Sequence, residues 1–118
     1  MMRIVRDYLN TAKENEAVFR SILRDLKNNR KTRPMGMYVP ESLQTEAPLE
    51  EIFRLYSEGR RYGIFSICDF GIERVGNETF AIISFQDVAC LSGGGATLRY
   101  AVNNKEASYL KAEGVMMS

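Results

Sequence analysis

The stretch from Tyr62 to Val102 predicts three antiparallel strands in consecutive order, because apolar residues alternate along it and two turn signals divide it. The pair Gly76-Asn77 provides the small residues, tolerant of positive φ, that a two-residue hairpin turn needs. Closing the chain there pairs Val75 with Glu78. Every later pair follows, since side chains alternate between the two faces of a strand. The glycines at 93–95 offer the second reversal.

In this register one face of the predicted sheet is apolar in all three strands. Pairing Leu91 with Ala96 across the second turn places the third strand on the same face. Its members, strand by strand, are Tyr62, Ile64, Cys68, Phe70 and Ile72, then Ala81, Ile83, Phe85, Ala89 and Leu91, then Ala96, Leu98 and Val102. A slip of one residue in either hairpin would remove the agreement.

One row of this apolar face is polar. The predicted register puts Ser66 opposite Asp87, and Asp87 opposite Tyr100. A buried carboxylate costs free energy unless its oxygens receive hydrogen bonds, and both hydroxyls can donate them. We therefore expect a ligand pocket made of this row and its neighbours, with a satisfied polar row in a filled core as the alternative. The expected neighbours are Tyr62, Phe70, Phe85 and Leu98.

Residues 1–118 have the length of a single domain, which can bury enough surface to fold without staples. Lys and Arg total 16 and Asp and Glu total 15, so a formal net charge of +1 indicates neither a nucleic-acid nor a membrane partner. The sequence contains no apolar run long enough to span a membrane, and its first residues do not read as a signal peptide. We expect a cytoplasmic protein.

The two cysteines and the absence of histidine limit the chemistry. Cys68 and Cys90 fall on opposite faces of the predicted sheet, so we expect two reduced thiols rather than a disulfide. Histidine is the commonest metal ligand and general base, and its absence argues against zinc and Ser-His or Cys-His catalysis. We expect neither a metal nor a cofactor.

Residues 3–30 contain neither glycine nor proline and carry apolar side chains at helical spacing. The apolar pattern weakens at Asn15, which favours two helices, the second starting at Glu16 behind an Asn15 cap. One bent helix and a coiled coil are the alternatives. A further helix is expected from Pro48 to before Gly59, because proline suits the first turn and glycine the end.

Two short regions remain. Met37-Tyr38-Val39, between prolines, is a candidate edge strand. A final strand is expected over 107–117, in one of two registers. A two-residue turn before it would put Tyr109 and Val115 on the core face, and a three-residue turn would put Leu110 and Met116 there.

Helices followed by an antiparallel sheet with one apolar face predict an α+β fold, with the helices packed on a curved meander in a cone-like shape. Four stretches support a family resemblance: residues 4–9, 55–64, 75–81 and the last strand. In their order they resemble the nuclear-transport-factor-2-like superfamily, which includes ketosteroid-isomerase-like and polyketide-cyclase-like proteins; a cystatin-like fold is the near alternative. The chain departs from the family at 106–109, where Glu-Ala-Ser-Tyr replaces the frequent Gly-Lys-Trp.

The resemblance implies a cavity between helices and sheet, and often a homodimer through the outer sheet face. The residues support the dimer independently, because the predicted register leaves an apolar patch on that face larger than a monomer usually exposes. The patch consists of Phe65, Ile67, Phe80, Ile82 and Val88.

Three functions follow as hypotheses. The first is binding of a small apolar ligand in the pocket without chemistry. The second is an isomerase or cyclase in which Asp87 is the general base and Tyr100 donates to a developing oxyanion. The third is an interaction module without a ligand. Its candidate surface is basic: Lys27, Arg30, Lys31 and Arg33, with Arg60 and Arg61. No aromatic residues interleave with that cluster, so nucleic acid is not favoured.

Overall fold

The computed structural model describes the backbone of residues 3–33, 39–56, 65–87 and 94–116, and the side chains of 8–33, 39–56, 65–85 and 95–113. The described residues form an α+β fold, as predicted. Its elements are α1 (Arg3–Glu14), α2 (Glu16–Asn28), the short 3-10 helix η1 (Arg30–Thr32), α3 (Leu49–Tyr56), β1 (Phe65–Val75), β2 (Glu78–Asp87), β3 (Gly94–Asn103) and β4 (Glu106–Met116).

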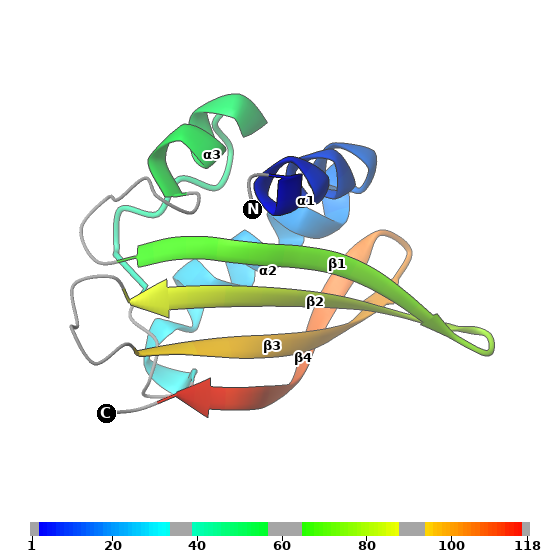
Figure 1. Cartoon of the computed structure of the whole chain (residues 1–118). Coiled ribbons are helices and arrows are strands. Elements are labelled where there is room, and N and C mark those ends of the chain that lie inside the picture. Colours follow the sequence, from blue (N-terminus) through cyan, green and yellow to red (C-terminus); the bar gives the residue numbers. More distant parts are fainter. Residues whose placement is uncertain (1–2, 34–38, 57–64, 88–93, 117–118) are drawn as a thin grey trace.

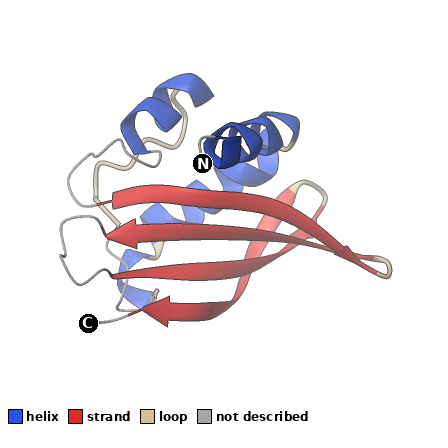
Figure 2. Ribbon diagram, in the orientation of Figure 1, coloured by secondary structure: helices blue, strands red, loops and turns tan. Residues whose placement is uncertain are grey.

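The four strands form one antiparallel meander in the order β1-β2-β3-β4. The helices lie on one face of it, where α1 and α3 pack against β1 and α2 packs against β4 (Figure 1). The sheet is strongly twisted, and the β1–β2 hairpin projects beyond the helices (Figure 2). No described helix covers the opposite face, which we call the outer face.

The helix break at Asn15 is confirmed, but the role of its side chain is not the expected one. The Asn15 amide donates to the carbonyl oxygen of Thr11 at 3.0 Å and so closes the end of α1. It makes no side-chain capping bond to α2, whose first backbone bond runs from the Phe19 N–H to the Asn15 carbonyl at 2.9 Å. Asn15 therefore marks the break by ending the first helix.

Helix α3 begins as the proline predicts. The carbonyl of Pro48 accepts from the backbone N–H groups of Glu51 and Ile52 at 2.9 and 3.0 Å. Acidic residues occupy the first turn, where the helix dipole favours them. The predicted end at Gly59 and most of the predicted edge strand at 37–39 lie outside the described residues.

An aromatic cluster joins the helices to the sheet. The ring of Phe19 stacks on Phe53 with centroids 5.3 Å apart and meets Phe70 edge-on at 5.1 Å. The Tyr8 hydroxyl donates to the carbonyl oxygen of Ile67 at 2.7 Å and ties α1 to β1. Among the described residues, no buried side-chain nitrogen or oxygen lacks a hydrogen-bond partner.

The first hairpin closes where the sequence predicts, at Gly76 with φ +62°. Val75 pairs with Glu78, Ile72 with Ala81 and Phe70 with Ile83. A β-bulge at Cys68 then changes the register, so that Ile67 rather than Cys68 lies opposite Phe85.

The bulge reverses the facing of the first part of β1. Phe65 and Ile67 were expected on the outer face, but they are 1% and 0% exposed and belong to the core. The prediction is wrong for these two residues because the extra residue at Cys68 shifts the side-chain alternation by one position.

The register of the second hairpin differs from the prediction, because Gly94 and Gly95, expected in the turn, belong to β3. Asp87 pairs with Gly94 instead of Tyr100, and Tyr100 pairs with Ala81. This is a shift of six residues from the expected register. Because six is even, the predicted face is kept, and Ala96, Leu98 and Tyr100 are all buried in the core.

The last strand begins in the first of its two expected registers. A two-residue turn at Asn104-Lys105, both with positive φ, places Tyr109 opposite Tyr100 on the core side. A bulge at Leu110 follows, after which Ala112 lies opposite Leu98 and packs against the core. The two-residue turn is therefore confirmed, whereas the three-residue turn and its core position for Leu110 are wrong.

Candidate functional site

The predicted polar row does not exist as a row. Ser66 lies opposite Gln86, and Asp87 lies opposite Phe65 on one side and Gly94 on the other. The proposed base Asp87 is thus separated in register from both hydroxyls, and the predicted Asp87–Tyr100 pair is wrong. The side chain of Asp87 and all of Tyr62 lie outside the described residues.

The apolar residues expected to line a pocket are core residues. Phe70, Phe85 and Leu98 are at most 4% exposed. Phe70 meets Phe19, and the ring centroid of Phe85 lies 4.9 Å from that of Phe65. These contacts place them at the centre of the packing between helices and sheet.

Tyr100 does bind a carboxylate, but the carboxylate belongs to α2. Its hydroxyl donates to Asp25 Oδ2 at 2.7 Å. The guanidinium of Arg33 donates to both oxygens of the same carboxylate, from Nη2 at 2.5 Å and from Nε at 3.1 Å. The side-chain amide of Asn29 adds a donor to Asp25 Oδ1 at 3.0 Å.

Ring contacts complete this cluster, which we call the Asp25 cluster: Asp25, Asn29, Arg33, Tyr100 and Tyr109. The Arg33 guanidinium lies 4.1 Å from the ring centroid of Tyr109, whose edge meets Tyr100. Burial, and then the hydrogen bond to Asp25, raise the pKa of Tyr100 well above its ordinary value. The carboxylate already has four donors and the phenol keeps its proton, so the cluster joins α2 to β3 and β4 rather than performing acid–base chemistry.

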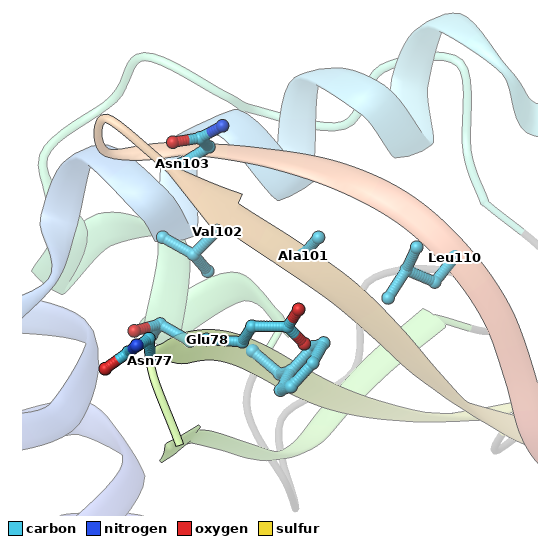
Figure 3. A pocket seen from close by; sticks show the side chains of 8 residues that line it. Asn77, Glu78, Ala101, Val102, Asn103 and Leu110 are labelled. Carbon is cyan, nitrogen blue, oxygen red and sulfur yellow. The ribbon is translucent and has the colours of Figure 1, made fainter. Parts of the chain in front are cut away.

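A different hollow lies on the outer face, near the tip of the β1–β2 hairpin (Figure 3). This groove has a volume of about 490 Å³, within the range of small-molecule sites. Strands β2, β3 and β4 and the turn at Asn77 contribute its lining. The apolar lining residues are Phe80, Ala101, Val102 and Leu110, and the polar ones are Asn77, Glu78, Thr79 and Asn103.

Ion pairs occupy the outer face beside the groove. Arg99 donates to Glu73 at 2.7 Å and to Glu113 at 3.0 Å, and its guanidinium lies 5.0 Å from the ring centroid of Phe80. The hydroxyls of Ser84 and Thr97 bond to each other at 2.9 Å. The polar side chains beside the groove thus bond to one another. Within the described residues, the polar side chains that line the groove form no such bonds.

Part of the predicted dimer patch is present on the outer face. Phe80 and Ile82 lie there and are half-buried, Phe65 and Ile67 do not, and Val88 lies outside the described residues. Val75 and Leu110, 55% and 49% exposed, are the large hydrophobic residues most open to solvent in the described part. Sequence reasoning named neither as part of this patch, and the alternative that placed Leu110 on the core face is wrong.

Two of the four described residues of the predicted basic surface form ion pairs. Arg30 bonds to Glu41 at 3.0 Å, and Arg33 belongs to the Asp25 cluster. Lys27 and Lys31 are exposed, and Arg60 and Arg61 lie outside the described residues. Cys68 is half-buried at the bulge, and Cys90 lies outside the described residues.

Comparison with known proteins adds no assignment: no protein-family model, curated protein or solved structure matches this chain. Within the described ranges, no helix has both the length and the apolar character required to cross a membrane. The same ranges contain no group of three acidic or cysteine side chains able to hold a metal ion. The fold and the outer groove therefore carry the functional argument.

Proposed function

We propose that this protein is a binding protein rather than an enzyme, and that its ligand is a small molecule held in the groove on the outer face. The groove itself carries the proposal. It combines an apolar floor with a few polar groups, which is the usual form of a small-molecule site. Its walls come from paired strands, which hold side chains more rigidly than loops do.

The packing between the helices and the sheet supports a ligand site on the outer face. The ring of Phe19 contacts those of Phe53 and Phe70 where a pocket between helices and sheet was expected. The order of helices and meander fits the nuclear-transport-factor-2-like architecture that the sequence resembles. Membership of that superfamily is part of the proposal, with the ligand moved from the cone to the outer face.

The lining supports binding without chemistry. Glu78 is the one titratable residue among those that line the groove. General acid–base catalysis of the isomerase type needs a base together with a donor that stabilises the developing charge. The other polar groups are two amides and a threonine hydroxyl, which can orient a ligand but have no acidic proton to give near neutral pH.

Filling the groove tests this proposal. Ala101 lies on its floor, and Ser108 is the cross-strand neighbour of Ala101 but is not part of the lining. We expect A101F to weaken the binding of small aromatic fragments at least about tenfold, because the new ring occupies the ligand's volume. S108F adds the same ring one strand away and should leave binding within about twofold of the native protein.

Ligand-observed NMR with benzyl alcohol, phenylbutanol and indole measures these effects. The proposal fails if A101F binds the fragments as well as the native protein does. It fails equally if none of them binds the native protein at millimolar concentration.

A homodimer through the outer face is the second candidate function. It is favoured by Val75 and Leu110, two exposed apolar side chains on the face that no described helix covers. If a second copy occupies this face, sedimentation analysis should show a dimer that L110K converts to a monomer. N28K, with the same charge on α2, should leave the dimer intact. A native protein that stays monomeric at high micromolar concentration excludes this candidate.

A further inference from the structure

We infer that the groove selects an organic cation, namely a primary amine carried on an apolar body. This inference rests on the proposed function and names its class of ligand. Three features lead to it: the single carboxylate in the described lining, the pairing of the nearby Arg99 with other carboxylates, and the amides beside the apolar residues.

In the described part of the chain, the carboxylate of Glu78 forms neither an ion pair nor a side-chain hydrogen bond. It extends from the side where Asn77 lies toward the side where Leu110 lies, along the groove (Figure 3). A ligand in the groove therefore meets one uncompensated negative charge.

The cations of the outer face do not neutralise it. Arg99 is held by Glu73 at 2.7 Å and by Glu113 at 3.0 Å, and it is not part of the lining. Lys111 lies 3.7 Å from Glu113. Arg74 and Lys105, on the flanking hairpin ends, do not line the groove either. None of these cationic side chains therefore balances the negative charge of Glu78 in the groove.

The rest of the lining suits an ammonium group on an apolar chain. An ammonium has three N–H donors and no acceptor. The carboxylate of Glu78 and the amide oxygens of Asn77 and Asn103 are acceptors, and neither amide has a side-chain hydrogen bond within the described residues. Phe80 and Leu110 provide apolar surface for the body of the ligand.

The charge preference is expected to be modest because Glu78 is exposed. An ion pair in contact with water contributes little, so an amine should bind roughly threefold more tightly than its neutral analogue at low salt. Physiological salt should reduce the preference. An anionic analogue should bind most weakly of the three.

Three ligands of one shape test the inference: phenylbutylamine, phenylbutanol and phenylbutyrate. Titration of each into isotopically labelled protein, followed by backbone amide shifts, gives both the affinity and the place of binding. We expect the order amine, alcohol, acid in the native protein, with the largest shifts near Phe80 and Leu110. E78Q should bind amine and alcohol equally, since it keeps the shape but loses the charge.

E106Q is the matched control, because Glu106 begins β4 opposite Asn103 but does not line the groove. It should preserve the preference for the amine. If the native protein binds the alcohol as tightly as the amine, the charge selection is wrong and the proposed groove stands. If E106Q loses the preference as E78Q does, the effect is the net charge of the protein and the inference fails. If no ligand binds, the inference and the proposed function both fail.

Discussion

Replacing Asp25 with alanine is expected to lower the free energy of unfolding by about 3 kcal/mol. The side chains of Asp25 and Arg33 are only 19% and 10% exposed, and the Tyr100 hydroxyl has Asp25 as its partner. Removing the carboxylate leaves a largely buried guanidinium without its counter-charge and a buried phenol without its acceptor. Both losses destabilise the folded state, because neither group regains its hydration.

Two variants separate this effect from a general loss of an ion pair. E46A breaks the exposed pair between Glu46 and Arg24 and should cost clearly less than D25A, because water screens that pair. Y100F removes one donor from the Asp25 cluster and should cost about 1 kcal/mol. Urea denaturation followed by circular dichroism measures all three. The structural role assigned to the cluster is wrong if D25A costs no more than E46A.

Replacing Phe65 with alanine is expected to cost about 3–4 kcal/mol, because the bulge at Cys68 turns this side chain into the core. Phe65 is 1% exposed. Its ring lies 5.6 Å from the ring centroid of Tyr56 and 4.9 Å from that of Phe85. Truncation therefore removes contacts on both sides and leaves a cavity between α3 and the sheet.

Phe80 is the matched control, because it is a phenylalanine on the other face of the same sheet. It lies on the outer face and is half-buried, so F80A should cost about 1 kcal/mol. The same denaturation experiment compares the two. A continuous alternation without the bulge predicts equal, small costs for both phenylalanines, and that result would contradict the observed register.

The partner of Tyr100 illustrates which part of the candidate site was predictable. A carboxylate was expected beside this hydroxyl, and a carboxylate lies there, but it comes from Asp25, 75 residues earlier in the chain. Strand periodicity relates a residue only to its neighbours within the sheet. Which helical side chain meets Tyr100 depends on how α2 docks on β3 and β4, and no spacing within one element encodes that docking.

The groove was not predictable for a related reason. Phe80 was expected on the outer face as part of an apolar patch, and it lies on that face. The hollow beside it depends on the twist of the sheet and on the bulge in β4, where Leu110 is the extra residue on the outer face.

Local features of the chain were determined by its sequence alone. Gly76 and Asn77 set the first turn, Asn15 sets the break between α1 and α2, and the alternation of β2 and β3 sets which side chains face the helices. These follow from backbone conformation and side-chain period over a few residues.

The tertiary structure decided the register. A six-residue shift between β2 and β3 leaves every side chain on its face, so the apolar pattern cannot detect it. Around Cys68 both alternations are apolar, and the bulge lies next to Ile67, whose carbonyl accepts a hydrogen bond from Tyr8 on α1. An apolar pattern of period two is unchanged by an even register shift. Only contacts between distant elements distinguish registers that differ by such a shift.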